Sequence, residues 1–127
     1  MGYSLSGGVA LASATRMPEL VETVAVSYPL TNFIKDPAEF LGKMKVPVLM
    51  MAGIADTYRD CCLIEETRQL ELASKASSLS LLTLHEYAGV GHGFSLSNAP
   101  PKDQAAAADA MVRTISWLRQ GLPPTTR

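Results

Sequence analysis

Three polar residues, Ser4, Asp56 and His92, stand at places in this chain where side-chain chemistry is expected. Ser4 lies in the segment GYSLSGG, at the turn into a predicted helix. Asp56 and His92 each follow a predicted strand, and His92 stands between two glycines. Such a loop gives a histidine nothing to pack on, and an imidazole with a pKa near neutral is the natural general base. We therefore interpret His92 as a functional residue.

The elements that must position these residues alternate along the chain. Strands are predicted where β-branched or unbroken apolar residues gather, at 21–28, 46–52 and 79–87. Helices are predicted between and around them, at 6–16, 37–41, 63–76 and from Asp103 to Gly121. This alternation is typical of crossover units and a parallel sheet, in which ligands and catalytic groups gather at the carboxyl ends of the strands.

The last predicted helix has recognisable ends. Asp103 after two prolines is interpreted as its cap, and Gly121 as its stop. Apolar residues recur at helical spacing on the face expected to be buried, which consists of Ala108, Met111, Ile115 and Leu118.

We expect an α/β fold of three layers, with helices on both faces of a short, mainly parallel sheet of about three strands. Residues 1–121 are predicted to form the domain, and residues 122–127 a frayed C-terminal tail. The length of 127 residues suits one domain or part of one.

Three segments carry a resemblance to known enzymes. The segment around Ser4 resembles the nucleophile elbow G-x-S-x-G of α/β-hydrolases, with Ser6 in place of the second glycine. The segments 46–56 (VPVLMMAGIAD) and 85–94 (HEYAGVGHGF) resemble the acid turn and the histidine loop of the dienelactone hydrolase family. Because all three occur in the right order with the spacing preserved, the chain resembles the C-terminal half of that family's fold.

The resemblance implies a serine hydrolase that cleaves carboxylic esters or lactones through an acyl-enzyme. His92 would take the proton of Ser4, and Asp56 would hold the imidazole in the correct tautomer. The backbone N–H of Leu5 would donate to the oxyanion. Many members of the family use cysteine as the nucleophile, whereas this chain has Ser4.

Other interpretations of single residues stay open. Ser4 could be a helix cap, and Asp60 is a rival to Asp56 for the acid, although Asp56 lies closer to the end of its strand. His85 lies inside a predicted strand and is interpreted as a packed or surface residue. Two other functions are alternatives: a non-catalytic remnant that acts by self-association or binding, and a serine peptidase of the same fold.

Composition and charge exclude some classes of binding partner for this chain. A net charge of −1 argues against nucleic acid or an anionic membrane as the main partner, and no apolar run approaches a membrane span. Cys61 and Cys62 are adjacent, which makes a poor crosslink and matches no zinc pattern. We therefore expect a cytoplasmic protein with a small ester or lactone substrate and with no cofactor or metal.

Only Met1 precedes Gly2, whereas an elbow serine normally follows a buried strand. The sequence therefore predicts a truncated fold, with an exposed sheet edge through which the chain could self-associate. It also predicts weakened activity, because the loss of one oxyanion donor costs about 10²–10³ in rate.

Overall fold

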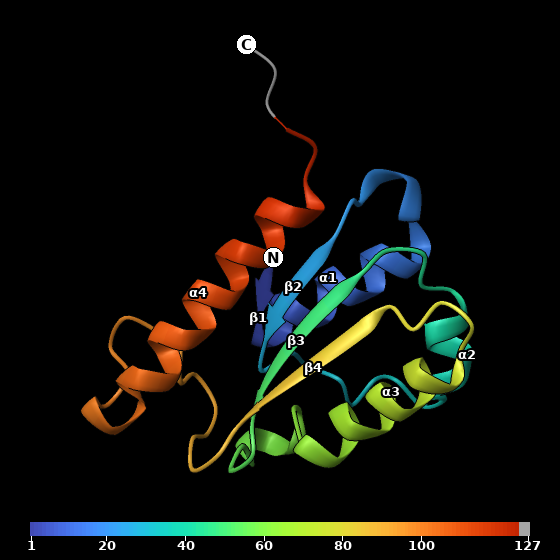
Figure 1. Cartoon of the computed structure of the whole chain (residues 1–127). Coiled ribbons are helices and arrows are strands. Elements are labelled where there is room, and N and C mark those ends of the chain that lie inside the picture. Colours follow the sequence, from blue (N-terminus) through green and yellow to red (C-terminus); the bar gives the residue numbers. More distant parts are fainter. Residues whose placement is uncertain (125–127) are drawn as a thin grey trace.

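The computed structural model describes residues 1–124. It contains one sheet of four parallel strands, ordered as in the chain: β1 (Gly2–Tyr3), β2 (Val24–Ser27), β3 (Val48–Gly53) and β4 (Leu82–Tyr87). The helices are α1 (Ser4–Arg16), α2 (Pro37–Gly42), α3 (Ile64–Ala76) and α4 (Gln104–Gly121). Short 3₁₀ turns lie at Pro18–Leu20, Tyr58–Asp60 and Pro101–Asp103. The predicted alternation and the parallel sheet are confirmed (Figure 1).

Strand β1 is the element that the sequence analysis placed outside the chain. Gly2 pairs with Val26 and Tyr3 pairs with Ser27, in parallel register. Two residues of the strand before the elbow are therefore present, and the sheet has four strands where about three were expected. This short strand matters because Ser4 follows it directly.

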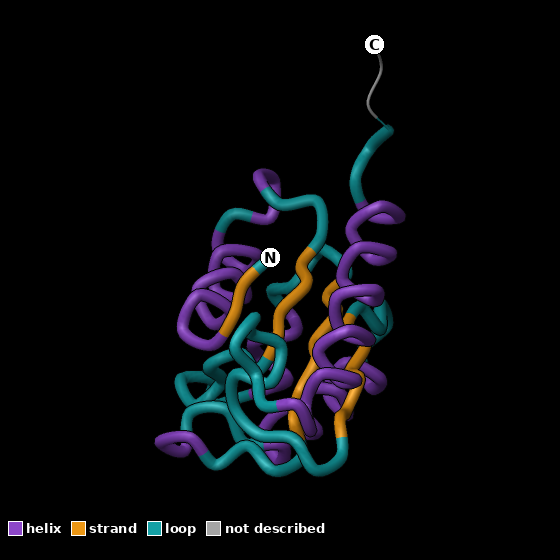
Figure 2. The backbone as a smooth tube through the Cα atoms, turned by 90° about the vertical axis from the view of Figure 1, so that its left-hand side faces the viewer, coloured by secondary structure: helices purple, strands orange, loops and turns teal. Residues whose placement is uncertain are grey.

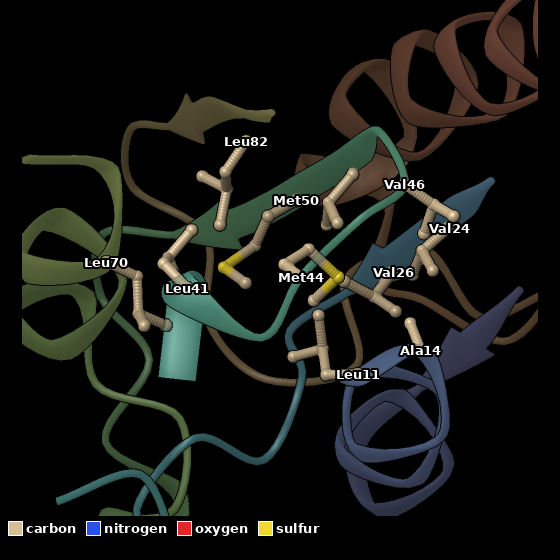
Figure 3. Close-up of a cluster of buried hydrophobic side chains, with 11 residues drawn as sticks. Leu11, Ala14, Val24, Val26, Leu41, Met44, Val46, Met50, Leu70 and Leu82 are labelled. Atoms are coloured by element: carbon tan, nitrogen blue, oxygen red, sulfur yellow. The ribbon is translucent and has the colours of Figure 1, made fainter. Parts of the chain in front are cut away.

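Side chains alternate between the two faces of the sheet, as the period of two in a strand requires. One face packs against α1, α2 and α3, as in the apolar cluster of Figure 3, with buried Leu11, Leu41 and Leu70 drawn from the three helices. The other face packs against α4, which runs along the opposite side of the sheet (Figure 2). The central strands β2 and β3 are buried throughout, as predicted for strands covered on both sides.

The buried face of α4 differs from the predicted one. The buried residues that face the sheet are the small Ala110 and Thr114. Of the four residues predicted to be buried, Leu118 packs against the core and is partly buried, whereas the other three are exposed: Ala108, Met111 (49%) and Ile115 (41%). The close approach is fixed by Trp117, whose indole N–H donates to the Thr23 hydroxyl at 2.9 Å. Apolar residues do repeat along α4 at helical spacing, but most of the predicted ones lie on the face of the helix that is exposed to solvent.

Of the two predicted ends of α4, the structure confirms the C-terminal one and not the N-terminal cap. Asp103 precedes the helix but makes no side-chain capping bond, and its carboxylate instead accepts from Lys102 at 3.0 Å. Gly121 is the last residue of α4, as predicted. Of the predicted tail, residues 125–127 lie outside the described residues. Within residues 1–124, no helix combines the length and apolarity that a membrane crossing demands.

Candidate active site

The structure brings the three predicted site residues together at the carboxyl end of the sheet. Ser4 Oγ lies 2.9 Å from His92 Nε2, and His92 Nδ1 lies 2.9 Å from Asp56 Oδ2. A neutral imidazole satisfies both contacts when its Nδ1–H donates to the carboxylate and its Nε2 accepts from the serine hydroxyl. The arrangement can therefore pass a proton from the hydroxyl to the imidazole.

Ser4 occupies a sharp turn between β1 and α1. Its φ of 50° lies in the left-handed region, which is costly for a residue with a side chain and persists only when the surroundings impose it. A Cβ on Gly2 would lie 2.5 Å from the Ser6 carbonyl oxygen, so only glycine fits there. The Ser4 carbonyl accepts from the Leu30 N–H at 2.9 Å, which ties the turn to the loop after β2.

Ser6, which stands where the elbow motif usually has glycine, braces the same turn. Its hydroxyl accepts from the Tyr3 N–H at 3.0 Å and donates to the Tyr3 carbonyl at 2.8 Å. The departure from the motif thus adds two hydrogen bonds next to Ser4.

Two glycines let α1 lie close to the loop after β2. A Cβ on Gly7 would meet Pro29 Cβ at 2.9 Å, and one on Gly8 would meet the Leu30 carbonyl oxygen at 2.8 Å. Both contacts fix the start of the helix, and with it Ser4, against the sheet.

Asp56 is held by the turn that follows β3. Its side chain is 1% exposed, and the oxygen that does not face His92 accepts from the Tyr58 N–H at 3.0 Å. Asp60, the rival acid, lies exposed in the next 3₁₀ turn. The carboxylate in contact with the imidazole is therefore that of Asp56.

Two tyrosines enclose the His92 ring, and the sequence analysis missed both. Tyr58 stacks on it with centroids 4.5 Å apart, and Tyr28 meets it edge-on at 5.0 Å. Burial raises the pKa of Tyr28, whose hydroxyl accepts from Ser95 at 3.1 Å. Their positions were the available signal, since Tyr28 directly follows β2 and Tyr58 lies two residues after Asp56.

Leu5, the predicted oxyanion donor, is the second residue of α1. Its N–H belongs to the first turn of the helix, whose N–H groups have no partner within the helix and carry the positive end of its dipole. The position suits a donor to negative charge developing beside Ser4.

His85 lies apart from this group. Its ring packs on Tyr87 on β4, and its Nε2 lies 3.6 Å from Asp109 on α4. Burial lowers the pKa of His85. This agrees with its interpretation as a packed or surface residue of a strand.

Cys61 and Cys62 differ from expectation, because the structure joins them in a disulfide. Both are buried, directly after the 3₁₀ turn Tyr58–Asp60, where the bend of the chain brings the neighbouring sulfurs together. Their sulfurs and a ring nitrogen of His92 all lie within 4.8 Å of one another. The pair thus adjoins the relay.

Solved structures share this fold. A "Putative Dienelactone Hydrolase" from Klebsiella pneumoniae matches with a TM-score of 0.74 and 18% identity, over 94% of this chain and 50% of that one. Thermogutta terrifontis esterase 2 matches with a TM-score of 0.72 and 14% identity, over 98% of this chain and 55% of that one. The fold is that of the α/β-hydrolases.

Sequence comparison identifies the family within this fold class. The pattern of the dienelactone hydrolase family matches residues 1–122, and the chain belongs to that family. A "Putative carboxymethylenebutenolidase" of Escherichia coli O157:H7 is 27% identical over 124 residues. The match covers 94% of this chain and 44% of that protein, so the chain spans about half the length of the relatives it matches.

Proposed function

We propose that this chain carries the reaction centre of a serine hydrolase for small carboxylic esters or lactones. The observation that carries the proposal is the continuous relay from Ser4 through His92 to Asp56, with both contacts at 2.9 Å. Membership of the dienelactone hydrolase family supports the substrate class.

The proposed reaction has two halves. His92 Nε2 takes the Ser4 proton as Oγ attacks the ester carbonyl, and the buried Asp56 carboxylate stabilises the imidazolium that forms. The tetrahedral intermediate then collapses, and His92 gives its proton to the departing alkoxide to leave an acyl-Ser4. Water, deprotonated by His92, then attacks the acyl group, and His92 returns that proton to Ser4 Oγ as the acyl–oxygen bond breaks and the acid leaves.

The Leu5 N–H is the proposed donor to the oxyanion. It lies at the start of α1, one residue after the nucleophile, where the helix dipole also favours negative charge. The activity and substrates of the longer relatives are carried over to this chain as part of the proposal.

The test is hydrolysis of p-nitrophenyl acetate by the chain and by Ser4→Ala, with the exposed Ser78→Ala as a matched serine control. We expect Ser4→Ala to lose at least about 10³-fold in kcat/KM, since a relay residue acts as part of a unit. Equal rates for the chain and Ser4→Ala would remove the hydrolase proposal and favour the non-catalytic alternative. A peptide p-nitroanilide in the same assay tests the peptidase alternative.

Labelling gives a second readout that needs no turnover. Thermogutta terrifontis esterase 2, which shares the fold, has been phosphoramylated by tabun. An organophosphorus probe such as a fluorophosphonate should label this chain at Ser4, as located by peptide mass spectrometry. His92→Ala should label far more slowly, because the serine loses its base.

We also propose self-association through the β1 edge. Strand β1 lies at the edge of the sheet; Met1, which precedes it, and Leu5 and Val9 on the adjoining α1 are 58%, 66% and 58% exposed. An unpaired edge next to exposed apolar side chains favours pairing with a second copy. Light scattering after size-exclusion chromatography should show a dimer, which Val9→Lys should weaken; a monomer at all concentrations would reject this proposal. A cytoplasmic location stays a prediction.

A further inference from the structure

We propose that Cys61, Cys62 and His92, once the disulfide is reduced, form a binding site for a soft divalent metal ion such as Zn²⁺. We further propose that occupation of this site switches off the hydrolytic relay. The proposal of a switch rests on the proposed function, whereas the proposal of a metal site does not.

The juxtaposition comes from the fold and not from the sequence spacing. Adjacent cysteines match no zinc pattern, but the loop after β4 brings a histidine from 30 positions further along. The two sulfurs and the ring nitrogen lie within 4.8 Å of one another. Ligand atoms of a tetrahedral Zn²⁺ are about 3.5 Å apart, given bonds of about 2.0–2.3 Å. To form the site, the imidazole must therefore approach the sulfurs by about 1 Å, and the two sulfurs, bonded to each other in the disulfide, must separate after reduction.

The chemistry of the ligand set selects the metal class. Two thiolates and an imidazole are the donors that Zn²⁺ and similar soft ions prefer, and water can fill the fourth position. Both cysteines are buried, at 6% and 1% exposure. Two thiolates would be costly there alone, but together they balance the charge of the divalent ion.

The site forms in two balanced steps. A dithiol reagent such as dithiothreitol reduces the Cys61–Cys62 bond to two thiols and is itself oxidised to a cyclic disulfide. The metal ion then replaces both thiol protons, which pass to solvent, and accepts the lone pair of a His92 ring nitrogen. In the oxidised state no thiolate is available, so the disulfide protects His92 from the metal.

Metal binding would stop the relay whichever ring nitrogen is taken. If the ion takes Nε2, Ser4 loses its proton acceptor, and Asp56 at Nδ1 becomes the carboxylate that orients a metal-bound histidine. If the ion takes Nδ1, it displaces Asp56. Because Nε2 already contacts Ser4 and Nδ1 already contacts Asp56, a metal ion bound to either nitrogen would break a contact that the proposed reaction needs.

The binding test uses calorimetric titration of the reduced chain with ZnCl₂ after removal of the reductant. We expect one Zn²⁺ per chain, and no binding by the oxidised chain. Cys61→Ser, Cys62→Ser and His92→Ala should each weaken binding by at least about 10–100-fold, the range for loss of even an outer partner. His85→Ala, which changes the other histidine, should bind as the unaltered chain does. Titration with CdCl₂ should add thiolate-to-metal charge-transfer absorption in the ultraviolet.

The inhibition test measures p-nitrophenyl acetate hydrolysis, or fluorophosphonate labelling of Ser4, with and without ZnCl₂. Each protein is compared with itself without metal. The rate of the reduced chain should fall at least about ten-fold with ZnCl₂ and recover with EDTA, whereas the rates of the oxidised chain and of the Cys62→Ser variant should not change.

The possible contradicting results separate the proposals. Zinc binding without inhibition would overturn the proposal that the metal switches off the relay. No binding by the reduced chain, or binding that His92→Ala leaves unchanged, would overturn the site. Failure of the hydrolase proposal would instead show as equal rates for the chain and Ser4→Ala.

Discussion

Gly53 lies so close to Val90 that a Cβ on residue 53 would stand 2.4 Å from the Val90 carbonyl oxygen. Gly53 ends β3 and leads into the turn of Asp56, whereas Val90 lies two residues before His92. The same Val90 carbonyl accepts from the Ala55 N–H at 3.0 Å. The loops that carry Asp56 and His92 are therefore held in register by direct contact between their backbones.

Gly53→Ala should separate the two loops and lower kcat for ester hydrolysis by about 10²-fold, since misplacing a reacting group by about 1 Å costs this much. The added methyl meets backbone that cannot yield easily, so the free energy of unfolding should also fall by about 1–3 kcal/mol. Gly42→Ala is the matched control, because its Cβ would meet no atom within 4 Å. Unchanged hydrolysis by a folded Gly53→Ala would contradict this account.

Ser6→Ala tests the two hydrogen bonds between Ser6 and Tyr3 that hold the turn at Ser4. The change removes both hydrogen bonds to Tyr3 and leaves the Ser4 hydroxyl in place. Because the bonds are exposed, the free energy of unfolding should fall by no more than about 1 kcal/mol. The rate should fall through kcat rather than through KM, which steady-state kinetics can separate. A change in KM alone would show that Ser6 acts on substrate binding instead.

Tyr58 is expected to position His92 through its stacked ring. Tyr58→Ala removes an aromatic contact worth about 0.5–1.5 kcal/mol, so kcat/KM should fall by up to about ten-fold. Tyr58→Phe keeps the ring and should restore most of the rate. If the phenylalanine variant were as slow as the alanine variant, the hydroxyl and not the stacking would be the important feature.

His85 gives a prediction about pH. Burial, and then the nearby Arg113, lower the pKa of His85 below its ordinary value of 6.5, although Asp109 acts in the opposite direction. The unfolded chain therefore takes up this proton first, and stability falls as the pH drops from about 6.5 toward the folded pKa. Above that range the group contributes no pH dependence.

Urea unfolding at about pH 7.5 and about pH 5.5 measures this effect. His85→Gln should lose less stability between the two pH values than the unaltered chain. Equal losses of stability in the variant and in the unaltered chain would show that folding does not lower the pKa of His85.

The sequence predicted the fold well where the pattern was local. The unbroken apolar run of β3 and the alternation of helices and strands gave the parallel sheet, and the polar residues after the strands met at one edge. Strand β1 was missed because two residues are too few to show a period, and their pairing with Val26 and Ser27 depends on contacts far along the chain.

The buried face of α4 was misassigned because the helix has two apolar faces. Met111 and Ile115 suggested the core by size, but Ala110 and Thr114 allow the closer approach to the sheet. The sequence did not show the two tyrosines around His92, or the closeness of Cys61 and Cys62 to it, for another reason. They join residues from separate loops, and no spacing in the sequence encodes them.

The position of β1 in the sheet predicts how the proposed activity would be lost on heating. The conformation of Ser4 depends on β1, an outer strand of the described sheet, whereas β2 and β3 are buried throughout. The free energy of local unfolding of an outer strand is smaller than the free energy of unfolding of the whole domain. The proposed hydrolysis should therefore be lost at a lower temperature than the one at which circular dichroism records the unfolding of the helices.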